Sequence, residues 1–93
     1  MRIIWDEKGL LFIPLREEVK RKVEEQVAKI DPSKLENLRE YEVYGDEIVL
    51  EEPDPMEGQY VKIVKHKGKF MLVAGNWEHE FREEYYVAEV RFS

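Results

Sequence analysis

Hydrophobic residues recur with a helical period between positions 15 and 30. They stand three or four residues apart and form one apolar stripe, made of Leu15, Val19, Val23, Val27 and Ile30. Spacing of this kind is typical of an amphipathic helix that packs on a core. Asp31 and Pro32 follow it, and these residue types are favoured at a helix N-cap and first turn. The pattern therefore predicts a long helix from about Leu15 to Ile30 and a short one from Pro32 to Leu38.

Elsewhere, apolar and polar residues alternate with the period of two that is expected of strands. The first predicted pair joins Arg2–Asp6 to Leu10–Ile13 through a turn that closes on a left-handed Gly9. The second is a hairpin over residues 41–50 with its turn at Gly45 and Asp46. Its register places Val43 opposite Ile48 and Tyr41 opposite Leu50.

A third hairpin is predicted from Gln59–His66 and Lys69–Ala74, joined by a turn at Lys67 and Gly68. Its register pairs Ile63 with Leu72, Val61 with Ala74 and Lys65 with Phe70. The last predicted strand covers about Tyr85–Phe92, with Tyr86, Ala88, Val90 and Phe92 on one face.

The elements together predict an α+β fold in the order ββα(α)βββββ. A mostly antiparallel sheet of about six to seven strands carries one long and one short helix on one face. A sheet that curls toward a barrel is the alternative. The 93 residues contain no repeat and no linker, so a single domain is expected over residues 1–93.

The composition limits the environment of the protein. The chain has no cysteine and no threonine, few Asn, Gln and Ser, and many Glu and Lys, as expected of a protein from a thermophile. It has no disulfide framework and no thiolate metal site. No apolar run is long enough to span a membrane, and the start lacks the apolar region of a signal peptide. A cytoplasmic protein without a membrane partner is expected.

Catalytic chemistry has little support in the sequence. The two serines stand at a helix start and at the end of the chain, and no Gly-rich phosphate loop is present. Two histidines, His66 and His79, match no spacing of metal ligands. Carboxylate pairs carry no specific signal in a chain with this many Glu. No catalytic, cofactor-binding or metal-binding residue is assigned, and no cofactor is expected.

Charge is distributed unevenly and points to a candidate nucleic-acid surface. Residues 31–58 carry ten acids and two bases, whereas residues 59–75 carry four lysines and no acid. The basic hairpin would contact phosphates and bases through Lys62, Lys65, His66, Lys67, Lys69 and Trp77. The net charge of −6 opposes this function, because nucleic-acid-binding domains are usually basic. The alternative is that the acidic and basic hairpins lie side by side and pair their charges.

The leading interpretation is a protein interface on the face of the sheet away from the helices. The third hairpin would expose apolar side chains there, and the last strand would extend the patch; its residues are Tyr60, Val64, Met71, Val73, Tyr85 and Val87. The alternative is that the sheet curls and buries both faces, or that residues 76–84 fold over the second face. The sequence thus favours a small non-enzymatic protein-interaction module, homodimeric or bound to another protein, from a thermophilic prokaryote or its mobile elements. A nucleic-acid-binding protein using residues 59–75 is the first alternative, and a small-molecule enzyme is the second.

Overall fold

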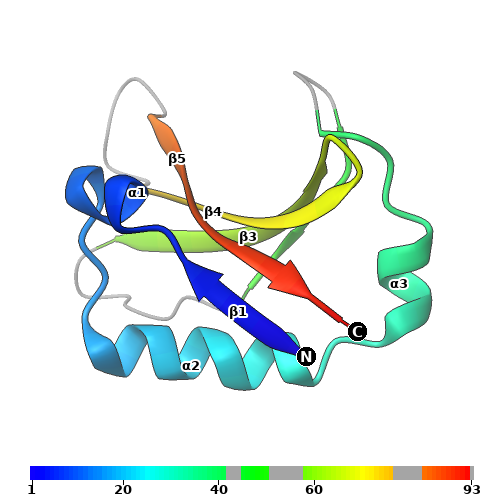
Figure 1. Ribbon diagram of the computed structural model, residues 1–93, viewed down its shortest axis with the longest axis horizontal. Coiled ribbons are helices and arrows are strands. Elements are labelled where there is room, and N and C mark those ends of the chain that lie inside the picture. Colours follow the sequence, from blue (N-terminus) through cyan, green and yellow to red (C-terminus); the bar gives the residue numbers. More distant parts are fainter. Residues whose placement is uncertain (42–44, 51–57, 77–82, 93) are drawn as a thin grey trace.

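The fold was analysed in a computed structural model, which describes residues 1–41, 45–50, 58–76 and 83–92. The described part is an α+β fold with a five-stranded antiparallel sheet and three helices (Figure 1). In chain order the elements are β1 (Arg2–Trp5), α1 (Glu7–Phe12), α2 (Glu17–Ala28), α3 (Pro32–Glu36), β2 (Glu47–Val49), β3 (Gln59–His66), β4 (Lys69–Asn76) and β5 (Glu84–Arg91). The sheet has the order β1-β5-β4-β3-β2 and is not closed into a barrel. It contains fewer strands than the six to seven predicted.

The predicted first hairpin is wrong, because residues 7–12 form a helix. The Asp6 carboxylate accepts the backbone N–H of Lys8 at 3.0 Å and caps α1. Gly9 is buried against β5, where a Cβ would overlap the carbonyl oxygen of Tyr86 and lie 3.2 Å from the Cα of Val87. Gly9 therefore permits a close approach of two backbones rather than a left-handed turn.

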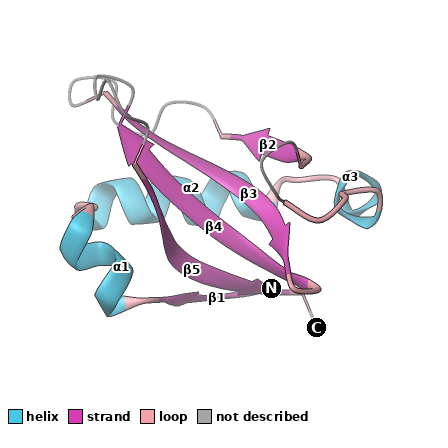
Figure 2. Cartoon of the chain, turned by 90° about the horizontal axis from the view of Figure 1, so that it is seen from above, coloured by secondary structure: helices cyan, strands magenta, loops and turns pink. Residues whose placement is uncertain are grey.

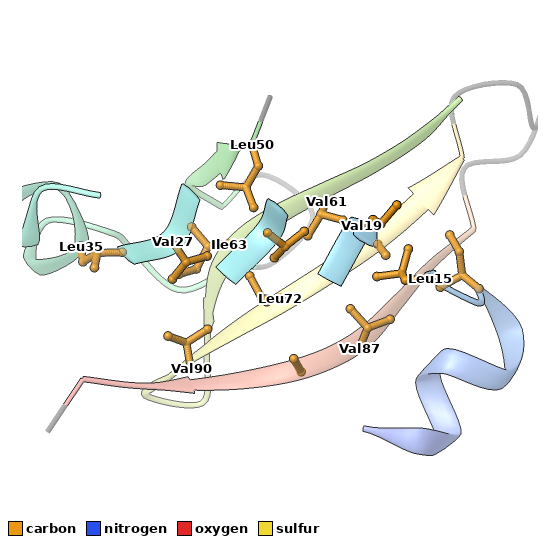
Figure 3. Packing of buried hydrophobic residues seen from close by; sticks show 14 of the residues in the cluster. Leu15, Val19, Val27, Leu35, Leu50, Val61, Ile63, Leu72, Val87 and Val90 are labelled. Atoms are coloured by element: carbon orange, nitrogen blue, oxygen red, sulfur yellow. The ribbon is translucent and has the colours of Figure 1, made fainter. Parts of the chain in front are cut away.

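The amphipathic helix is confirmed as α2, and its apolar stripe faces the sheet. Figure 3 shows the buried side chains of α2 converging on those of β3, β4 and β5. The most deeply buried of this core are Val19, Val23, Val27, Val61, Ile63, Leu72 and Val87. The predicted short helix is also present as α3, with Asp31 as its N-cap and Leu35 buried. Packing of one helix stripe on one sheet face is thus what holds the layers together.

The hairpin of β3 and β4 is confirmed in its register. Ile63 lies opposite Leu72, Val61 opposite Ala74, and Lys65 opposite Phe70. Lys67 and Gly68 form its two-residue turn with positive φ angles of 53° and 76°. This conformation is that of the hairpin turn whose twist matches the strands that it joins.

The predicted hairpin over residues 41–50 is not the arrangement found. Tyr41 donates its backbone N–H to the carbonyl of Lys65, and Leu50 donates to the carbonyl of Val61. Both residues therefore bond to β3, at different points along it, instead of pairing with each other. Residues 42–44, including Val43, lie outside the described residues. Ile48 pairs with Ile63 of β3. β3 is long enough to offer backbone hydrogen-bonding groups along one edge to the segment at Tyr41 and to the segment of Ile48 and Leu50. Each segment therefore pairs with β3, and the predicted hairpin does not form between them.

An irregularity in β5 changes which side chains face the core. Leu72 lies opposite Ala88, but the next residue, Val73, lies opposite Tyr86, so Val87 is an extra residue in the ladder. The bulge places Val87 and Ala88 both in the core. Tyr85 also packs against the core. The prediction that Tyr85 and Val87 lie on the second face is therefore wrong.

The layers leave one edge of the sheet open. α2 lies across one face, α3 lies near the end of β5, where Leu35 and Phe92 line one hollow, and α1 packs against β5 (Figure 1). Seen from above, β1 forms the margin of the sheet with no described element beyond it (Figure 2). None of the three helices in the described ranges has the length and apolar character needed to cross a bilayer.

Candidate functional site

A buried polar cluster occupies the face of the sheet opposite α2. The ammonium group of Lys62, on β3, contacts Glu47 Oε2 of β2 at 2.6 Å and Glu84 Oε1 of β5 at 2.6 Å. Lys62 also donates to the hydroxyl of Tyr41 at 2.9 Å. Two tyrosines donate to Glu84, Tyr41 at 2.9 Å and Tyr60 at 2.7 Å. The cluster thus ties three strands of the sheet to the segment that precedes β2.

The hydrogen bonds of the cluster determine the protonation states of Lys62 and Glu84. Burial disfavours the charged form of Lys62, but the hydrogen bonds that its ammonium group donates to Glu47, Glu84 and Tyr41 outweigh this effect and raise the lysine pKa. Burial likewise opposes the charge on Glu84, and hydrogen bonds with Lys62, Tyr60 and Tyr41 outweigh it and lower the carboxyl pKa. Both groups are therefore charged at neutral pH.

This chemistry favours a structural role for the cluster. An ammonium group has three protons, and three acceptors surround that of Lys62, so it has no remaining donor for a ligand. Only 4% of Lys62 is exposed. Acid–base catalysis uses groups whose pKa lies near the working pH, and both shifts move these groups away from neutrality. We therefore assign the cluster to the stability of the sheet.

The candidate nucleic-acid residues are separated by the structure. Lys62 is buried and paired with Glu47, so the alternative of charge pairing between the hairpins holds for this lysine. Lys67 and Lys69 are exposed and Lys65 is half-buried. Trp77 lies outside the described residues. The predicted surface is thus reduced to the lysines at the tip of the β3–β4 hairpin.

An acidic residue also neutralises that tip. The carboxylate of Glu40 accepts the backbone N–H groups of Lys67 at 2.8 Å and Gly68 at 2.7 Å. These two N–H groups would otherwise form a small anion-binding concavity. The chain fills this position with its own carboxylate.

Of the two histidines, only His66 lies among the residues that the structure describes. The Nδ1 atom of His66 lies 3.3 Å from the hydroxyl of Tyr86, and the two rings are 4.8 Å apart between centroids. Burial, followed by nearby negative charge including that of Glu84, holds the pKa of Tyr86 above its usual value. His79 lies outside the described residues.

The predicted apolar interface is not an exposed patch. Tyr60, Val64, Val73 and Val87 are buried within the chain, and Met71 and Tyr85 are half-buried. Tyr41 crosses this face of the sheet, and the bulge turns Val87 into the core. Tyr60, Val64, Val73 and Val87 therefore fit the alternative in which both faces of the sheet are buried.

A different apolar surface is exposed on α1, and the sequence analysis missed it. Leu11 and Phe12 are consecutive residues at the end of α1, and their exposed fractions are 82% and 67%. The ring of Phe12 stacks on Tyr85 of β5, with 4.8 Å between centroids and 4° between planes. A hollow of about 250 Å³ lies beside the stack; its lining includes Pro14, Gln59, Asn76 and Glu83. We call Leu11, Phe12, Tyr85 and this hollow the α1 surface.

A second apolar hollow lies near the ends of the chain. It has a volume of about 300 Å³ and is lined by Pro32, Leu35, Glu36, Phe70 and Phe92. The ring of Phe92, which is 41% exposed, packs edge-to-face on Phe70 with 5.5 Å between centroids. Phe70 lies opposite Lys65 in the β3–β4 hairpin, so this half-buried lysine is the basic residue on the same face as the two rings.

A third hollow also gives the enzyme alternative no convergent set of acidic groups. It has a volume of about 490 Å³ and is lined by residues of α2, α3 and β2 and the segments beside them, with Asp31 as its acid and Lys29 and Lys34 as its bases. The Asp31 carboxylate already accepts the backbone N–H of Ser33 at 3.0 Å and caps α3. Comparisons of the chain with protein-family models, curated proteins and solved structures give no match.

Proposed function

We propose that the protein is a non-enzymatic interaction module that binds a partner protein through the α1 surface. The observation that carries the proposal is the pair of consecutive, largely exposed apolar residues, Leu11 and Phe12, on one short helix. Single exposed apolar residues are normal on proteins, whereas contiguous ones mark contact surfaces.

The anchoring of α1 supports this function. Gly9 holds the helix backbone directly against β5, and Phe12 is held in a stack on Tyr85. Two apolar side chains are thereby presented by a fixed backbone, so little conformational entropy is lost when a partner binds. The neighbouring hollow offers a place for a side chain of the partner, as hot spots of interfaces usually do.

The test is affinity capture from a lysate of the source organism with the tagged chain. Three baits are compared: the native chain, Leu11→Lys, and the matched control Val49→Lys. Val49 is also exposed and lies on β2, away from α1. We expect the native chain and the control to retain the same stoichiometric protein, before and after nuclease treatment, and Leu11→Lys to lose it.

Two results would contradict the proposal. Equal retention by all three baits would show that Leu11 does not contribute to binding. Recovery of the bait without a stoichiometric protein would remove the support for an interaction module. Circular dichroism of each bait establishes that the substitutions leave the fold intact, as expected at exposed positions.

A nucleic-acid-binding protein is the second candidate, and one observation favours it. The partly exposed ring of Phe92 lies on Phe70, and Lys65 lies opposite Phe70 on the same face, which combines a stacking platform with positive charge. The buried Lys62 and the position of Glu40 weaken this reading. Retention of the chain on single-stranded DNA that falls with salt, and is lost in Lys67→Glu/Lys69→Glu, would favour it over protein binding.

A further inference from the structure

We propose that a second copy of this chain pairs with the open edge of β1, so that two sheets join into one. This surface is separate from the α1 surface, and the inference does not depend on the proposed function. It rests on the position of β1, the direction of its backbone groups and the charges at its two ends.

β1 is a four-residue edge strand that lacks the lysines, prolines and bulges that often prevent pairing. Natural edge strands are blunted by lysines, prolines, bulges or very short length. β1 has the sequence Arg-Ile-Ile-Trp, pairs regularly with β5 and has no bulge. β2, at the opposite edge, has only three residues and begins with Glu47. The two edges therefore differ in their capacity to add a strand.

The hydrogen bonds to β5 determine which backbone groups of β1 face outward. The N–H of Asp6 donates to the carbonyl of Val87 at 2.8 Å. Because backbone groups alternate in direction along a strand, Ile4 also bonds toward β5, and Ile3 and Trp5 direct their N–H and C=O groups to the open edge.

Two-fold symmetry and charge select one register. Directly opposed residues must lie on the same face of the joined sheet, so the two-fold axis passes beside a residue and not between two residues. Near the middle of β1 this residue is Ile3 or Ile4. Pairing about Ile4 places Arg2 opposite the second copy's Asp6, and it does so twice. Ile3 and Trp5 then exchange backbone hydrogen bonds between the copies. Pairing about Ile3 would leave Arg2 opposite an isoleucine, so charge complementarity favours Ile4 as the centre.

The test combines charge reversal with measurement of molar mass. The chain has a mass of 11.2 kDa, and we expect the native protein to reach twice this mass as its concentration rises in sedimentation equilibrium. Arg2→Glu places a carboxylate opposite Asp6, and Asp6→Arg places a guanidinium opposite Arg2, so each variant alone should remain a monomer. An equimolar mixture restores both opposite-charge pairs and should recover the double mass. Arg21→Glu, on the exposed side of α2, is the matched control and should associate like the native chain.

Hydrogen exchange supplies a second readout, since Asp6→Arg also removes the cap of α1. The amides of Ile3 and Trp5 should exchange more slowly at high protein concentration in the native chain, and this protection should be lost in Arg2→Glu. A native chain that stays at 11.2 kDa with unprotected Ile3 and Trp5 amides would overturn the inference. A mixture that stays monomeric while the native chain dimerises would overturn the register about Ile4.

Discussion

Gly9 of α1 and Tyr86 of β5 meet backbone to backbone, 77 positions apart in the sequence. A Cβ on Gly9 would overlap the Tyr86 carbonyl oxygen and would lie 3.0 Å from its carbonyl carbon. The contact fixes the distance between the first helix and the central part of the sheet. It also explains why a residue with low helix propensity stands inside α1.

Substitution of Gly9 by alanine should therefore destabilise the protein. Alanine is about 1 kcal/mol better than glycine inside a helix, so propensity alone predicts a gain. The overlap with β5 should reverse the sign and lower the free energy of unfolding by about 2 kcal/mol. Urea unfolding measures the difference, with Glu7→Ala in the same helix as the control. A stabilised Gly9→Ala variant would contradict the close contact.

Replacement of Lys62 by methionine should be among the most destabilising changes in the polar cluster. It leaves Glu47 and Glu84 near each other without their shared cation, and loss of one partner from a buried ion pair costs about 3 kcal/mol or more. The double variant Lys62→Met/Glu84→Gln removes one of the two uncompensated charges as well and should recover part of the loss. Chemical denaturation of both variants decides whether the charges are coupled; additive losses would contradict the coupling.

The depressed pKa of Glu84 predicts a dependence of stability on acid pH. In the unfolded chain the carboxyl has its ordinary pKa of 4.5, and in the folded chain the pKa lies lower. The charged form is thus favoured by folding, so the stabilisation is present above pH 4.5 and is lost as the pH falls through the folded pKa. Glu84→Gln should be less stable at neutral pH and should lose less stability on acidification.

Thermal unfolding across acid pH measures this effect. The variant keeps a residual acid dependence, because hydrogen bonds from Arg39 also lower the pKa of Asp46. Parallel stability curves for the native chain and Glu84→Gln would show that Glu84 is not the group responsible.

The turn between β3 and β4 offers a stabilising substitution. Lys67 has a φ of 53°, a left-handed conformation that asparagine adopts more readily than lysine. Lys67→Asn creates the Asn-Gly pair favoured in this turn and keeps the backbone N–H that Glu40 accepts. The free energy of unfolding should rise by up to about 1 kcal/mol. The control Lys69→Asn, outside the turn, should show no gain.

Local patterns allowed part of the fold to be predicted. The stripe of α2 and the register of the β3–β4 hairpin depend on neighbouring residues and on a two-residue turn, so both could be predicted. The residues Leu10–Ile13 form a continuous apolar run that fits either a strand or a helix, and the role of Gly9 depends on β5, far along the chain. Asp6, followed by Glu7 and Lys8, is itself a helix-start signal, because Asp is favoured at an N-cap and an acidic residue is favoured in the first turn.

The candidate sites were less predictable because they depend on tertiary contacts. Alternation correctly placed Lys62 on the same face as Tyr60 and Val64, but its charge suggested exposure. Its burial requires Glu47 and Glu84, which are brought together only by the order of the strands. The bulge at Val87 likewise cannot be recognised from the alternation of apolar and polar residues in β5. The exposed pair on α1 could be recognised only once that segment was known to be a helix.

The pairing of β1 with β5 also bears on how the chain folds as it is synthesised. Arg2 lies opposite Arg91, so β1 pairs with a strand that is synthesised long after it. At roughly 5–20 residues per second, β1 is made several seconds before β5. During this interval its apolar sequence lacks its pairing partner, and a long loop must close before the two strands meet. The sheet therefore cannot be completed until β5 has been made, and β1 is the segment on which a holdase chaperone would act in the meantime.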